Sequence, residues 1–261
     1  MVRPHGLLRA GFPYLKTLGM RRITNFPADV ALGAEGRVYV LLRTEVASEI
    51  RVWHFDDAES LTDSLISIGS FGKNDGQMTW PVQMIADSDE NLFVSDEALH
   101  RISSFSMDGE FLGMWGEQGS DDGQINGPSG IAFDGEGNVL VVDTLNHRVQ
   151  KFTREGKFIS KWGSFGSEPG QFNMPWGIHV DELGAVYVVD WRNDRLQKFS
   201  ADGEFIFEIG TSGSGNGQFN RPTGVAVDSD GDIYVADCGN DRVQLFNEEG
   251  RYIEKFLGDA T

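Results

Sequence analysis

The sequence predicts an all-β protein, a β-propeller of four-stranded antiparallel blades. Two observations predict this fold: four residue types recur at a spacing of 47 residues, and each repeat holds short apolar runs separated by turn residues. A fixed period of this length indicates one supersecondary unit in several copies, each burying its apolar faces against its neighbours. The recurring positions are Gly76, Gly123, Gly170 and Gly217; Pro81, Pro128, Pro175 and Pro222; Asp96, Asp143, Asp190 and Asp237; Arg101, Arg148, Arg195 and Arg242.

The repeat at 116–162 illustrates the expected elements in order. Gly, Asp and Asn in its turns supply the positive φ angles and side-chain caps that tight turns require. Its apolar runs are short enough for strands buried on both faces, whereas helices need longer apolar periods. Four such strands per unit, stacked around an axis, form a propeller. The strands are expected at 128–133, 139–142, 148–152 and 157–162, with turns at 134–137, 143–147 and 154–156.

Aligning the copies predicts where each blade begins and ends. The propeller is expected to span 14–258, after a ragged N-terminal segment at 1–13. Residues 14–19 resemble the outermost strands of later units and are interpreted as a lone outer strand. The first unit is diverged but keeps Pro27 and the apolar run 38–42. The blades are expected at about 20–68, 69–115, 116–162, 163–209 and 210–257.

Two recurring motifs carry a family resemblance. The segment Asp143-Thr-Leu-Asn-His-Arg148 has echoes that begin at Asp190 and Asp237, and Gly-Gln-Phe-Asn-x-Pro precedes the inner strand at 170–175 and 217–222. The chain resembles the NHL-repeat β-propeller family over nearly its whole length. Members are usually six-bladed, so the resemblance implies a six-bladed propeller of which about five blades are present here. A closed five-bladed ring is the alternative.

Charge and composition limit the classes of partner. The chain carries 40 acidic against 22 basic residues, and the first 22 positions hold five of the basic residues and no acidic one. Phosphate recognition needs clustered Lys and Arg, so nucleic-acid binding is disfavoured, although some propellers of the resembled family bind RNA. Arg192, Arg195 and Arg221 could still form a local basic patch.

The expected location is the cytoplasm. No apolar stretch approaches the roughly 18 residues that cross a membrane, and we expect no membrane partner. Cys238 is the single cysteine, which excludes an internal disulfide and fits a reducing compartment. The acid-free N-terminus could also mimic a mitochondrial presequence.

The repeated Asp and Arg are interpreted as structural. They lie at the two ends of the turn between the second and third strands, where the carboxylate can accept backbone N–H bonds and the guanidinium can reach it. A pair that recurs in four blades cannot define one catalytic site. The Gly-Gln before each Pro is interpreted in the same way.

Function is expected where the repeats differ. Alternating strand direction places the loop before each Pro and the turn after each Asp on one rim of the propeller. Trp, Met and Arg are enriched in binding hot spots, and they gather at these variable positions. Aromatic residues on this rim could instead plug the central channel. The candidate binding residues are Trp80, Met174, Trp176, Trp191, Arg192 and Arg221.

A metal site is the alternative. His179 stands in an inner strand where neighbouring copies have Ala132 and Ala226, and Asp29 and Gln83 are the other polar candidates. Peptide-amidating lyases related to the resembled family hold zinc with histidines from several inner strands, but here His179 has no such partners. The segment 228–232 resembles the start of a calcium loop without its later glutamate.

The sequence thus favours a non-enzymatic scaffold that binds a protein or peptide through its loop rim, without a cofactor. A metal-dependent hydrolase or lyase using zinc or calcium in the channel is the alternative, so enzymatic activity is left open. If a sixth blade is missing, unpaired blade edges would also permit association between copies.

Overall fold

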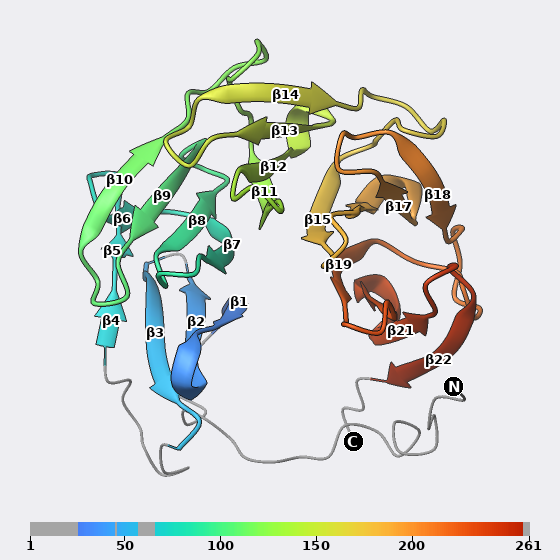
Figure 1. Ribbon diagram of the computed structural model, residues 1–261, viewed down its shortest axis with the longest axis horizontal. Coiled ribbons are helices and arrows are strands. Elements are labelled where there is room, and N and C mark those ends of the chain that lie inside the picture. The colour runs from blue at the N-terminus through green and yellow to red at the C-terminus, as the bar shows by residue number, and fades with distance from the viewer. Residues whose placement is uncertain (1–25, 45, 57–65, 258–261) are drawn as a thin grey trace.

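The computed structural model describes residues 26–44, 46–56 and 66–257. It contains five four-stranded antiparallel sheets, each with its strands in sequence order, and no α-helix in these residues. Figure 1 shows the five sheets as blades around a common axis, with the inner strands β1, β7, β11, β15 and β19 toward the centre. The all-β propeller that the sequence predicts is confirmed. The first blade consists of β1 (Pro27–Leu32), β2 (Arg37–Arg43), β3 (Ser48–His54) and β4 (Ile66–Ile68).

The four remaining blades repeat one pattern. A short parallel pair, β5 (Ser70–Phe71) and β6 (Gln77–Met78), precedes the second blade, and single parallel bridges stand at the same place before the other three. The strands are β7 (Pro81–Ala86), β8 (Leu92–Asp96), β9 (Arg101–Phe105) and β10 (Phe111–Trp115); β11 (Pro128–Phe133), β12 (Val139–Asp143), β13 (Arg148–Phe152) and β14 (Phe158–Trp162); β15 (Pro175–Val180), β16 (Val186–Asp190), β17 (Arg195–Phe199) and β18 (Phe205–Ile209); β19 (Pro222–Val227), β20 (Ile233–Asp237), β21 (Arg242–Phe246) and β22 (Tyr252–Leu257).

The core lies between successive blades rather than inside them. Four clusters of buried apolar side chains each join two neighbours: Tyr39 with Met84, for example, and Tyr187 with Val235. This arrangement follows from the apolar runs, because a strand with apolar residues on both faces needs a covering sheet on each side.

The contacts between inner strands run from β1 to β7, β11, β15 and β19 in turn. Within the described residues no comparable contact joins β19 to β1, and Figure 1 shows the first and fifth blades apart. Five blades match the five-bladed alternative in number.

Two other expectations concern parts outside these blades. The expected outer strand at 14–19 lies outside the described residues. No described helix is long and apolar enough to cross a bilayer.

The recurring Asp and Arg form a buried polar network in the last three blades. Asp143 accepts hydrogen bonds from Arg148 Nε at 2.7 Å, from Gln150 Nε2 at 3.0 Å and from the Asn126 backbone N–H at 2.6 Å. The same network surrounds Asp190 and Asp237. This bears out the structural interpretation, since the carboxylate fastens the loop before the inner strand to the turn after the second strand.

The second blade departs from that network. Asp96 accepts backbone N–H bonds from Thr79 and Trp80, and Arg101 keeps the bonds to backbone carbonyls of the preceding loop, but its Nε atom does not bond to Asp96. Ser103 occupies the position of Gln150 and is too short to take its place. The Nε atom of Arg101 and the Oγ atom of Ser103 are both buried there without a hydrogen-bond partner.

Candidate functional site

The rim side chains are set by a backbone device that repeats from blade to blade. In every described blade except the second, the residue before the inner-strand Pro adopts a left-handed conformation, with φ of 53° at Met174 and 51° at Arg221. Its N–H donates to a side chain 27 residues earlier: to Nδ1 of His147 at 3.0 Å for Met174, and to Oδ1 of Asp194 at 2.7 Å for Arg221. Met174 and Arg221 are therefore each fixed by the blade before them, whereas the N–H of Trp80 donates to Asp96 of its own blade.

The acceptors occupy one repeated position. His147 and Asp194 each follow a short 3₁₀ turn, η3 (Thr144–Asn146) or η4 (Trp191–Asn193), and are themselves left-handed. His100 does the same for the N–H of Gly127, at 3.0 Å. The sequence analysis did not assign this positioning role to the histidines. The sequence did contain a signal for it: the repeated position holds His in two repeats and Asp in the next two, and both side chains can accept a backbone N–H bond.

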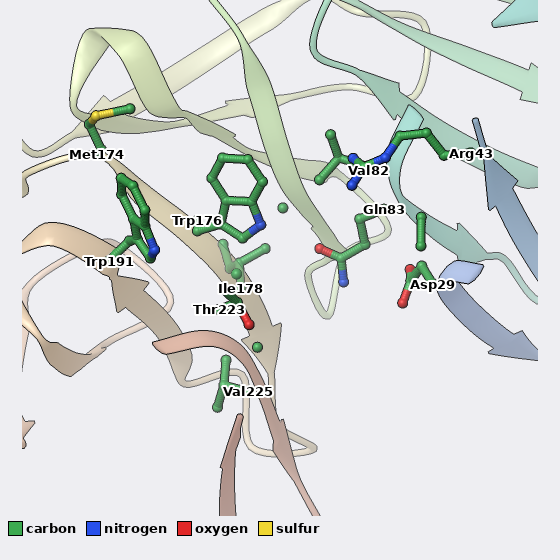
Figure 2. Close-up of a pocket in the computed structure, with 14 residues that line it drawn as sticks. Asp29, Arg43, Val82, Gln83, Met174, Trp176, Ile178, Trp191, Thr223 and Val225 are labelled. Atoms are coloured by element: carbon green, nitrogen blue, oxygen red, sulfur yellow. The ribbon is translucent and has the colours of Figure 1, made fainter. Parts of the chain in front are cut away.

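A cavity of about 580 Å³ opens at the mouth of the central channel. Its wall joins residues of all five described blades, because the inner strands converge there (Figure 2). The side chains that the argument uses are Asp29, Arg43, Gln83, Met174, Trp176 and Trp191.

One wall is aromatic and comes from the fourth blade. Trp176 extends from the start of β15, and Trp191 begins η4; their ring centroids lie 6.4 Å apart with 44° between the planes. Met174 lies beside Trp191 in Figure 2. The structure thus brings together three of the side chains that the sequence selected.

Arg192 and Arg221 lie beside this wall rather than in the cavity lining. Their guanidinium carbons are 5.3 Å and 5.4 Å from the centroid of the Trp191 ring. These are cation–π distances, so both arginines rest against the same indole.

The opposite wall is polar. Asp29 and Gln83 occupy the strand position that is glycine in the last three blades, for example Gly177. The Asp29 carboxylate accepts the N–H of Met84 at 2.8 Å, and Gln83 Oε1 accepts the N–H of Ile131 at 3.0 Å. Each side chain thus bonds to the inner strand of the next blade.

Charge at this wall is modified by burial. Burial raises the pKa of Asp29 to about 6, although its hydrogen bonds from the backbone of Met84 and Val30 act in the other direction. Burial also lowers the pKa of Arg43, which completes the wall from the end of β2 and which the sequence analysis missed.

Trp80 is separated from the aromatic wall. It lines a second cavity, of about 570 Å³, beside Phe26 and Val46. The guanidinium carbon of Arg43 lies 4.6 Å from the Trp80 ring centroid and borders both cavities. Trp80 therefore does not join Trp176 and Trp191 in one site.

His179 lies further along the channel, where it lines a third cavity with Asp29 and Gln83. Its ring bonds to the backbone of Val227 in the next blade, and burial lowers its pKa. Among the described residues no three His, Cys, Asp or Glu side chains are grouped to hold a metal ion. The assignment of His179, Asp29 and Gln83 as metal ligands stays a prediction.

These features define a β-propeller with a pocket at the mouth of its channel. The model of the NHL repeat matches residues 126–152, 172–199 and 219–246. The protein is therefore a β-propeller that contains three consecutive NHL repeats, in its third, fourth and fifth blades. No curated protein matches the chain in sequence.

Solved structures share the fold at low identity. A catalytically inactive virginiamycin B lyase from Staphylococcus aureus, solved with quinupristin, aligns with TM-score 0.66 and 14% identity over 94% of this chain and 73% of the other. A streptogramin B lyase aligns with TM-score 0.63 and 14% identity over 95% of this chain and 74% of the other. A protein of unknown function from Bacteroides caccae aligns with TM-score 0.64 and 15% identity over 89% of this chain and 81% of the other. At such identities the likeness concerns the fold alone.

Proposed function

We propose that the protein is a non-enzymatic scaffold that binds a protein or peptide in the pocket at the mouth of its channel. The observation that carries the proposal is the convergence of Met174, Trp176 and Trp191 on one wall of a single cavity. Large aromatic side chains are enriched among the residues that supply most of the binding energy at protein interfaces, and a methionine side chain adapts to irregular apolar surfaces.

The pocket also offers groups for orientation. Gln83 uses Oε1 within the fold, which leaves its Nε2 group as a donor at the opposite wall. A backbone carbonyl of an extended peptide is a suitable acceptor for it. An apolar side chain packed against Trp176 and Trp191 and a backbone bond at the facing wall together match a short peptide segment.

The hydrogen bond from the Met174 N–H to His147 pre-organises this surface. Because His147 fixes the backbone of Met174, the aromatic wall does not have to be ordered when a ligand binds. Pre-organisation reduces the entropic cost of binding.

Single substitutions test the site with a library of synthetic 12-residue peptides as the probe. Trp191→Ala and Trp176→Ala should each weaken binding of the peptides that the wild-type protein binds best by tenfold or more. Phe71→Ala is the control, since Phe71 is 41% exposed and lines neither cavity, and it should leave these affinities within about twofold. Equal losses in all three variants, or no loss at Trp191 and Trp176, would place the site elsewhere.

A metal-dependent hydrolase or lyase in the channel makes a different prediction. Elemental analysis of purified protein would then find zinc or calcium at one ion per chain, lost in the His179→Ala variant. That result would contradict a purely binding role.

A further inference from the structure

The two arginines beside Trp191 differ from most arginines of the described blades. Arg148, Arg195 and Arg242 pair with buried aspartates of their own blades. Within the described residues no ion pair or side-chain hydrogen bond engages Arg192 or Arg221, although the chain has a net charge of −18. Two guanidinium groups without an ion pair therefore lie against one indole ring, in a chain where acidic side chains outnumber basic ones.

Both arginines start from a fixed backbone. The N–H of Arg192 donates to the Asn173 carbonyl at 3.1 Å, and the N–H of Arg221 donates to Asp194. Contact with Trp191 then restricts both side chains. When a guanidinium lies on an aromatic ring, its N–H groups still point outward in the plane of the guanidinium. They can therefore donate to an oxyanion beside the ring.

We infer that Arg192, Trp191 and Arg221 bind an oxyanion of the ligand, a carboxylate or a phosphate group, beside its apolar anchor. The inference rests on the proposed peptide-binding function and specifies the ligand as an anionic peptide. Arginine forks match both groups with charge-assisted hydrogen bonds. The source is a Glu or Asp side chain, a chain terminus or a phosphorylated residue.

The charge around the cluster favours a peptide over a nucleic acid. A nucleic acid needs a track of cations that follows successive phosphates. Here the two arginines stand in a strongly acidic chain, which would repel a polyanion but would accept one or two negative groups placed at the cluster.

The first test uses sodium acetate and inorganic phosphate as probes, independently of any peptide. In ¹⁵N-labelled protein, each anion should shift the Trp191 indole signal, assigned with a Trp191→Phe variant. The Arg192→Gln/Arg221→Gln double variant should bind the more effective anion at least tenfold more weakly. Arg251→Gln is the control for net charge and should not change the titration, because Arg251 lies in an exposed turn. Shifts that persist in the double variant, or that are missing in the wild type, would overturn the inference.

The second test separates this inference from the proposed function. Matched peptide libraries containing Glu, phosphoserine or Gln at one position identify the source of the charge. The wild type should prefer Glu or phosphoserine over Gln by tenfold or more, and the double variant should lose that preference. Peptides bound equally with Gln would overturn the inference and leave the pocket proposal intact. Failure to bind any peptide would overturn the pocket proposal, and tighter binding of polyuridine RNA would overturn the peptide assignment.

Discussion

His147 Nδ1 accepts a hydrogen bond from the Met174 backbone N–H at 3.0 Å and thereby links the third blade to the wall of the pocket. Only a neutral imidazole has this acceptor. The groups around the ring are Phe165, which contacts it, and Asp190, Arg192 and Asp143, which act through charge. Burial lowers the pKa of His147 below its ordinary value of 6.5, Arg192 acts in the same direction, and the two aspartates oppose the shift.

The first prediction is a pH dependence with a defined sign. Because the folded-state pKa of His147 is below the unfolded value, the unfolded chain binds more protons between the two values. The contribution of His147 to stability is complete above about pH 6.5 and is lost as the pH falls from there toward the lowered pKa. Urea unfolding at pH 7.5 and pH 5.5 measures the effect.

The matched variant for this prediction is His147→Asn. Asparagine tolerates the left-handed backbone and offers an amide oxygen that does not titrate in this range. The variant should lose less stability than the wild type between pH 7.5 and pH 5.5, with His179 and the other titrating groups common to both. Identical pH slopes would show that the His147 bond does not control this response.

The second prediction concerns Trp162, which packs against the apolar cluster between the third and fourth blades. Its ring lies over Gly203 of the next blade so closely that an added Cβ would be 2.6 Å from the indole. Trp162→Ala should lower the free energy of unfolding by about 3 kcal/mol, because it leaves a cavity between two blades. Chemical denaturation checks this, and a cost below about half a kcal/mol would mean that the ring does not pack in solution.

The third prediction concerns the incomplete network of the second blade. In the last three blades a glutamine such as Gln197 accepts a hydrogen bond from a loop N–H at 2.8 Å and donates one to the recurring Asp. Ser103→Gln should restore these bonds beside Arg101 and raise the free energy of unfolding by about 1 kcal/mol. The reciprocal Gln197→Ser should lower it by about 1 to 3 kcal/mol. Destabilisation by Ser103→Gln would show that the second blade has repacked around serine.

The repeat explains why much of the molecule could be predicted from sequence. The 47-residue period contains strand, turn and strand signals in every copy, so the blades and the common rim of Met174, Trp176 and Trp191 follow from one alignment. Arg43 could not be found in this way. It comes from the diverged first blade and reaches the pocket across the channel, and that proximity depends on how far the blades curve around the axis.

The last prediction concerns the face of the first blade that is turned away from the second blade. Val30 and Ile178 occupy the same inner-strand position, but Val30 is 57% exposed and Ile178 2%. Ile178 is covered by the preceding blade, whereas no described blade precedes Val30. Ile178→Ala should therefore cost about 3 kcal/mol of unfolding free energy and Val30→Ala less than about 1 kcal/mol, because an exposed side chain has little apolar burial to lose. Comparable costs, or a Val30→Ala cost that grows with protein concentration, would show that another blade or a second copy covers this face in solution.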